Sequence, residues 1–288
     1  MTSQSSQLSC SIKRFDNGDS LLNRVLTEKE VQQVKIGTHA IINLITVYAD
    51  VKFPENILLT YTLNFVSSTR EETDLVALIP DLVYENNQQP NFVIKSKINK
   101  ILHGSCRKPH FDSEDGLIQV DIAIANSITD PESRPALLMM TGDQIYADDV
   151  AGPMLVAIHQ VINRLGLYEE CWLDDSEHHE LTRSSEELFN SSYCYYQRAN
   201  ILPHHTVNSA IFDKIFGARK AAIFTSVNVN NHLVTLSEVM AMYLLVWSPE
   251  LWALNDLNHH NVPSKYQERY QQELVVINKF IEGLPAIR

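Results

Sequence analysis

The chain has 288 residues, of which 44% are hydrophobic and 20% charged, with only 9 Gly, 11 Pro and 4 Cys. These proportions are typical of a globular protein and exclude a collagen-like, largely disordered or disulfide-dense chain. Acidic residues outnumber basic ones by 35 to 23, which gives a net charge of −12 at pH 7 and disfavours binding to duplex nucleic acid.

The N-terminal stretch MTSQSSQLSCSIKRFDNG is polar and lacks the apolar core of a signal peptide. No segment reaches the ~18 uninterrupted apolar residues of a membrane span. We therefore expect no membrane span and a cytoplasmic location. The cysteines form no CxxC pair and are expected to be free thiols; they are Cys10, Cys106, Cys171 and Cys194.

The first third of the chain is predicted to be β structure. Its apolar runs are rich in Ile, Val and Thr, and polar turn-forming stretches separate them. The runs cover residues 39–51, 56–66, 74–84 and 91–104. Several short strands of this kind predict a β-sandwich-like domain over residues 1–95.

From residue 96 to 288 the pattern mixes strands with helices, which makes the predicted fold class α+β or α/β. The run PALLMM at 135–140 is continuous and apolar, so it predicts a central strand buried on both faces. Helical spacing follows over 154–165, and Thr235-x-x-Glu238 predicts a capping box that opens an apolar helix. A last helix is predicted over 270–284, whereas the polar stretch 168–232 allows no assignment.

The sequence TGDQIYADD, residues 141–149, follows the predicted buried strand. Ligands of α/β sheets bind beyond the carboxyl ends of strands, so Asp143 would lie at that edge with Tyr146 nearby. The oxygens of Asp143, Asp148 and Asp149 suit a di- or trivalent cation. The alternative is a loop whose aspartate caps the next helix, and the spacing alone leaves both open.

The sequence HGSCRKPH, residues 103–110, ends a second β-branched run. Its separation from residue 143 allows a crossover between parallel strands, which would place Cys106 beside Asp143. Arg107, with Lys108 and His110, could lower the pKa of the Cys106 thiol or bind an anion. Taken alone, Cys106 is better explained as a small buried cysteine.

Further polar clusters at 174–180, 204–205 and 258–261 are expected to be solvated loops. The stretch Asn230-Asn231-His232 is similar to the Asn-His pairs of metallophosphoesterases, but Leu233 follows where an acidic residue is usual. We expect this stretch to precede a helix.

Taken together, HGSCRKPH, PALLMMTGDQIYADDVAGPML and HLVTLSEVMAMYLLVWSPELW resemble the PhoD-like metallophosphatase family, within the calcineurin-like and purple acid phosphatase superfamily. The resemblance spans roughly residues 95–288 and continues weakly into the first third, where the family has a β-sandwich-like domain. It implies hydrolysis of phosphate mono- or diesters by a metal-activated hydroxide.

The resemblance also implies a set of site residues. An iron ion, Fe(III), would be held by Cys106, Asp143 and Tyr146, and Asp143 would bridge to a calcium ion. Arg107 and His110 would contact the phosphate ester substrate. Ala147 departs from the family, many members of which have glutamate there.

A larger departure is the absence of the family's DDHE motif and of its later histidine and aspartate ligands. We therefore expect an N-terminal portion of such a phosphatase, with the first half of a metallophosphoesterase α/β core and a helical insertion, that is inactive or poorly metallated alone. The alternatives are a non-catalytic interaction or scaffold domain, and a half-enzyme completed in trans by another chain. A half-core would expose a sheet edge and apolar helix faces, so we expect repacked last helices or a homo-oligomer.

Overall fold

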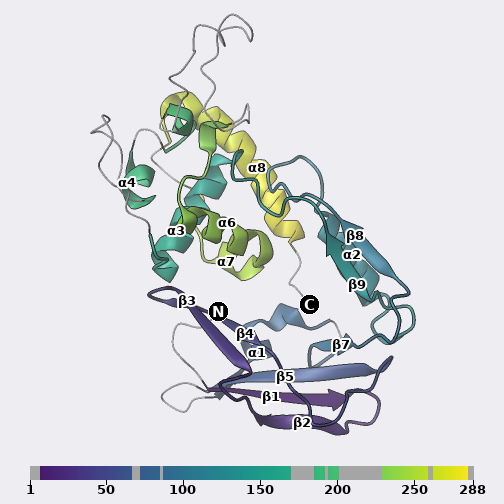
Figure 1. Cartoon of the computed structure of the whole chain (residues 1–288). Helices are drawn as coiled ribbons and strands as arrows, with labels where there is room; N and C mark the ends of the chain where they lie inside the picture. The colour runs from purple at the N-terminus through teal and green to yellow at the C-terminus, as the bar shows by residue number, and fades with distance from the viewer. Residues whose placement is uncertain are drawn as a thin grey trace, which may run out of the picture.

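The computed structural model places an antiparallel sheet at one end of the molecule and a group of packed helices at the other (Figure 1). It describes residues 7–66, 72–84, 87–169, 185–191, 194–200, 229–258 and 262–284. The fold is mixed α+β with antiparallel sheets and several helices, as the alternation of patterns in the sequence predicts.

The main sheet has five antiparallel strands in the order β2-β1-β5-β6, with β7 also paired to β5. Alternate side chains of β1 point into a small core, where Leu8, Cys10 and Ile12 pack with the fully buried Leu59. The strands are β1 (Gln7–Arg14), β2 (Ser20–Val25), β5 (Leu58–Val66), β6 (Glu72–Asp74) and β7 (Asn91–Val93).

The predicted β run at 74–84 is wrong over most of its length. The chain instead forms helix α1 (Leu75–Leu78) and the 3-10 turn η1 (Pro80–Leu82). The carboxylate of Asp74 accepts a hydrogen bond from the Ala77 backbone N–H at 2.6 Å, and this cap starts a helical turn.

The hairpin formed by β3 (Val31–Gly37) and β4 (Ala40–Ile45) connects the sheet end to the helices. The backbone N–H of Thr38 donates to the Gly166 carbonyl at 2.8 Å, just beyond the end of helix α3 (Gly152–Leu165). Gly166 has φ 54°, the left-handed conformation that commonly ends a helix. The tip of the hairpin therefore helps to satisfy the carbonyls at the C-terminus of α3.

Strands β8 (Ile101–Gly104) and β9 (Leu137–Met140) form a parallel pair in which Gly104 lies opposite Met140. Helix α2 (Gly116–Ala125) is the crossover between them. The strand predicted from PALLMM is present, but its predicted burial is wrong. Leu137, Leu138 and Met139 are 40%, 37% and 43% exposed, because β9 pairs only with β8 in the part of the chain that the structure describes.

A second core lies among the helices, where α3 packs against α6 (Leu236–Trp247) and α8 (Gln267–Gly283). Leu155, Met242 and Ile277 are among its fully buried side chains. The predicted capping box is confirmed, since Thr235 and Glu238 each accept a backbone N–H at the start of α6. The remaining short elements are α4 (Ser185–Asn190), α7 (Pro249–Ala253), η2 (Arg198–Asn200), η3 (Val229–Asn231) and η4 (Ser264–Tyr266).

None of the helices within the described residues combines the length and apolarity needed to cross a membrane. The predicted domain boundary near residue 95 lies between β7 and β8 and stays a prediction.

Candidate metal centre

The loops that follow β8 and β9 lie side by side. The Thr141 N–H donates to the Gly104 carbonyl at 3.2 Å, and the Arg107 N–H donates to the Asp143 carbonyl at 2.9 Å. These bonds extend the contact between the parallel strands beyond their carboxyl ends, where ligands commonly bind. Cys106 and Asp143 are thereby brought to the same edge.

Gly142 allows the close approach of these two loops. A Cβ atom placed on Gly142 would lie 2.5 Å from the Sγ atom of Cys106 and 2.5 Å from the Ser105 hydroxyl oxygen. It would also lie 2.7 Å from the backbone nitrogen of Cys106. Glycine is therefore the residue that fits between the loops without displacing them.

Cys106 is exposed, so the interpretation of it as a buried structural cysteine is wrong. A hydrogen bond with the Tyr146 hydroxyl is the largest influence that lowers the pKa of the Cys106 thiol. The Ser105 hydroxyl, 3.6 Å from Sγ, and the Asp143 N–H contribute in the same direction. These hydrogen-bond donors stabilise a thiolate at Cys106. The sequence had suggested that the basic residues next to Cys106 would lower this pKa.

The pKa of Tyr146 is shifted in the opposite direction. Its hydrogen bond with Cys106, followed by burial and the nearby negative charges, raises the pKa of the phenol to about 12. The phenol therefore keeps its proton and shares it with the Cys106 sulfur in the absence of a cation. A cation that took up both side chains would replace this proton.

The donor set fits a metal ion of high charge. Cys106, Asp143 and Tyr146 offer a thiolate, a carboxylate and a phenolate, all anionic when deprotonated. No three His, Cys, Asp or Glu side chains form a metal-ligand group among the described residues. The candidate centre contains two ligands of those types, and tyrosine supplies a third.

Asp149 connects the same two loops through ionic contacts. Its carboxylate pairs with the Lys108 ammonium, and its Oδ1 atom lies 3.5 Å from His110 Nε2. Burial raises the pKa of Asp149, but the hydrogen bonds from His110 and Lys108 outweigh burial and lower that pKa to about 2. His110 is thus held against the loop that follows β9.

The alternative helix-capping role for these aspartates is wrong. Helix α3 begins after Ala151, which forms no side-chain cap hydrogen bond. The first helical N–H, that of Gly152, instead donates to the Glu273 carboxylate from α8 at 2.7 Å.

Arg107 is buried and forms contacts that hold the loop. Its Nη2 atom lies 2.6 Å from Asp115 Oδ2, and Nη1 donates to the Val246 carbonyl at 2.8 Å. The guanidinium also lies 4.7 Å from the centre of the Trp247 ring. Arg107 therefore ties the candidate centre to α2 and α6, while its contact with phosphate stays a prediction.

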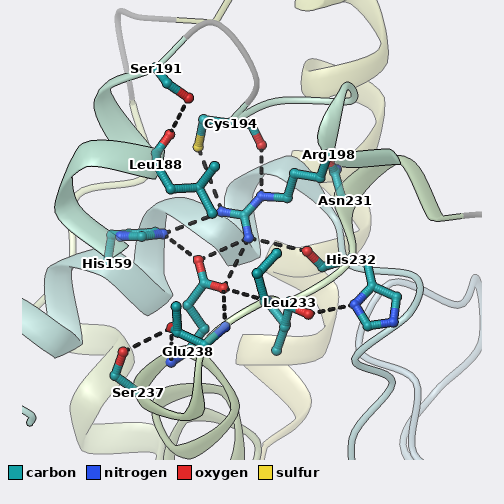
Figure 2. Close-up of polar contacts among 12 residues, drawn as sticks. His159, Leu188, Ser191, Cys194, Arg198, Asn231, His232, Leu233, Ser237 and Glu238 are labelled. Atoms are coloured by element: carbon teal, nitrogen blue, oxygen red, sulfur yellow. Dashed lines mark hydrogen bonds and ion pairs between the residues drawn. The ribbon is translucent and has the colours of Figure 1, made fainter. Parts of the chain in front are cut away.

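A second polar cluster lies inside the helical core (Figure 2). Glu238 Oε1 is 2.9 Å from both Arg198 Nη1 and His159 Nε2, and all three side chains are buried. His159 also stacks on Phe189 with ring centroids 4.3 Å apart. The sequence predicts only a helix-capping role for Glu238. His159 lies on an apolar helix face, and a histidine buried there needs a polar partner, so this position could have indicated the cluster.

Asn231 also has a structural role. Its amide oxygen accepts the Tyr196 N–H at 2.6 Å, and its amide nitrogen donates to the Val150 carbonyl at 2.7 Å. Asn231 ends η3 ahead of α6, as the sequence predicts. The clusters at 174–180 and 204–205 and most of that at 258–261 lie outside the described residues.

Comparison with known proteins finds no matching family model, and no match among the curated proteins or the solved structures. The resemblance to the PhoD-like metallophosphatases therefore depends on the sequence motifs alone and stays a prediction.

Proposed function

We propose that this chain carries part of the metal centre of a phosphate ester hydrolase of the PhoD-like type. The observation that supports the proposal most is the hydrogen-bonded pair of Cys106 and Tyr146 beside Asp143, at the carboxyl edge of parallel strands. An exposed cysteine next to a phenol that lowers the pKa of its thiol is a common feature of functional sites.

In this proposal Cys106, Asp143 and Tyr146 hold Fe(III), and Asp143 is shared with a calcium site. Phenolate and carboxylate are hard anionic donors that suit a trivalent cation, and thiolate is also a ligand of iron. A bound cation of this kind supplies Lewis acidity to the phosphate ester. His110, held by Asp149, faces the anionic substrate, and Arg107 supports the loop that presents Cys106.

We further propose that the antiparallel sheet corresponds to the family's β-sandwich-like domain. Strands β8 and β9 with the following helices would correspond to the first half of the catalytic core. A two-metal site needs ligands for both cations, about 3.5–4 Å apart. Three ligands do not complete such a site, so we expect weak or no turnover from this chain by itself.

The test is iron binding by the full 288-residue chain. We expect close to one iron per chain and a visible absorption band from phenolate bound to Fe(III). Cys106→Ser and Asp143→Asn should lower the iron content, and Tyr146→Phe should remove the band. Tyr48→Phe is the matched control, since Tyr48 is 62% exposed and outside this region. Iron content unchanged by all three substitutions would contradict the proposal.

Activity is measured in parallel on p-nitrophenyl phosphate and bis(p-nitrophenyl) phosphate with iron and calcium added. Turnover that Asp143→Asn abolishes would show that the chain is active alone and would overturn the expectation of an incomplete site. The same result would still support the proposal that Asp143 belongs to a metal centre.

A second candidate is a half-enzyme completed by another chain. The exposed apolar residues of β9, with Leu137, Leu138 and Met139 all more than one third exposed, favour it because parallel strands are normally covered on both faces. Light scattering after size exclusion tests the homo-oligomeric form. A monomer at all concentrations would exclude self-completion.

A further inference from the structure

A pocket of about 450 Å³ opens beside the candidate metal centre. It extends from Cys106 and Tyr146 towards the first turn of α2 and reaches Phe280 of α8. Its volume lies within the range of about 300–1,000 Å³ that holds small organic molecules. All of the residues that line it belong to the described part of the chain.

The pocket has both polar and apolar side chains in its wall. Ser105, Cys106 and Tyr146 are among the polar ones and belong to the loops of the candidate centre. The apolar side chains come from three separate parts of the chain. They are Phe111, Leu117, Val120, Met140 and Phe280.

The charges of the pocket wall are compensated. Arg107 pairs with Asp115 at 2.6 Å, and Lys108 pairs with Asp149. Glu114 adds a further carboxylate to the lining. An anionic group packed against the apolar side chains of the pocket would therefore lose hydration without gaining an arginine or lysine that is not already paired, whereas a neutral apolar group would gain by leaving water.

Phe111 is an aromatic residue of the lining that is 63% exposed. An exposed aromatic side chain in the wall of a cavity can stack on a flat organic group bound there.

We propose that this pocket binds the neutral, apolar organic group of the substrate, an aryl or branched alkyl group, while the phosphate lies beside Cys106 and Tyr146. The proposal rests on the proposed phosphate ester hydrolysis and adds the class of ester: one with a bulky apolar alcohol. The pocket selects against esters whose alcohol carries a second negative charge.

The first test compares phenylphosphonate with methylphosphonate on the iron-loaded full chain by calorimetry. Burial of the ring predicts about tenfold tighter binding of the phenyl compound. Val120→Asp should bring the two affinities within about twofold of each other, because it places a charge in the apolar wall. Gln119→Asp introduces the same charge at the exposed neighbouring position of α2 and should preserve the tenfold ratio.

Phe111→Ser is a second variant. It should not disturb folding, because Phe111 is mostly exposed. It should reduce the phenyl preference at least about threefold, about 0.7 kcal/mol. Equal affinity of the unaltered chain for both phosphonates, or the same ratio in the Val120→Asp and Gln119→Asp variants, would overturn the proposal while leaving metal binding intact.

A metal-free experiment separates this proposal from the proposed function. The neutral probe 1-naphthol is titrated into the full chain without iron and followed by NMR. Binding that Val120→Asp weakens at least tenfold, relative to Gln119→Asp, supports the apolar pocket even if no phosphonate binds. Naphthol affinity that is the same in both variants counts against the pocket whatever the metal content.

Discussion

The guanidinium Nη1 atom of Arg198 lies 2.9 Å from Oε1 of Glu238, and both side chains are 0% exposed (Figure 2). Arg198 belongs to η2, whereas Glu238 belongs to the capping box of α6. His159 joins the pair from α3 at 2.9 Å. One carboxylate therefore fixes three elements that are distant in sequence, and its charge is compensated inside the core.

We predict that Glu238→Gln destabilises the fold by about 3–5 kcal/mol, because it leaves Arg198 buried without a counter-charge. Glutamine keeps the size of the side chain and can still serve in a capping box, so the loss reports on charge. Urea unfolding measures it. Glu55→Gln is the control, since its pair with Lys52 is exposed and should change stability by less than about 1 kcal/mol. Equal losses in the two variants would refute the charge argument.

Glu238 also predicts a pH dependence. Burial raises its pKa, but the charge of Arg198 and the hydrogen bond with His159 outweigh burial and lower that pKa to about 2 from an ordinary 4.5. A lowered pKa in the folded state means that the contribution is complete above about pH 4.5. It is lost as the pH falls from there towards 2.

The measurement is the free energy of unfolding at several pH values between 5 and 2. The unaltered chain should lose stability more steeply than Glu238→Gln over this range. Asp149, whose pKa is also held at about 2, titrates in both proteins and cancels in the difference. Parallel curves would show that Glu238 is not the titrating group.

Gly142→Ala tests the close approach at the candidate metal centre. The added Cβ would meet Cys106 Sγ at 2.5 Å and force the two loops apart. We expect iron affinity to fall by about 10–100-fold, the size of effect that misplaced supporting groups produce. Gly116→Ala is the matched control, because a Cβ there meets nothing within 4 Å. Unchanged iron affinity in Gly142→Ala would remove the geometric basis for the centre.

Gly37→Ala tests the contact between the hairpin and α3. A Cβ on Gly37 would lie 2.6 Å from the carbonyl oxygens of Leu165 and Gly166, which are backbone atoms that cannot rotate away. We expect a loss of about 1–3 kcal/mol in stability. Amide exchange should accelerate at Thr38 and His39, which donate to those carbonyls at 2.8 and 3.0 Å. Exchange rates unchanged at both amides would show that the contact is not maintained in solution.

Features that depend on neighbours in the sequence were predicted well. The β-branched run at 56–66 contains β5, and the helical spacing over 154–165 matches all but the first turn of α3. The capping box of Thr235 and Glu238 was also predictable, since its partners are three residues apart. The length of the segment between β8 and β9 allowed the parallel pairing that the structure shows.

The candidate site was predicted in part. Its loops and residue types follow from strands that end in Gly-Ser and Gly-Asp, and the structure brings Cys106, Asp143 and Tyr146 together. The sequence did not indicate that Arg107 is buried against Asp115, or that hydrogen bonds rather than basic neighbours lower the pKa of Cys106. Those facts depend on side-chain directions that no spacing rule specifies.

The sequence by itself determined several elements, such as β5, α3 and α6, because backbone periodicity, caps and turns are set by residues within a few positions of one another. Only the tertiary structure decided that Arg198 meets Glu238 and that β9 is exposed. Burial and charge compensation depend on segments far apart in the chain. Their energies come from desolvation and packing between those segments, which a local pattern does not contain.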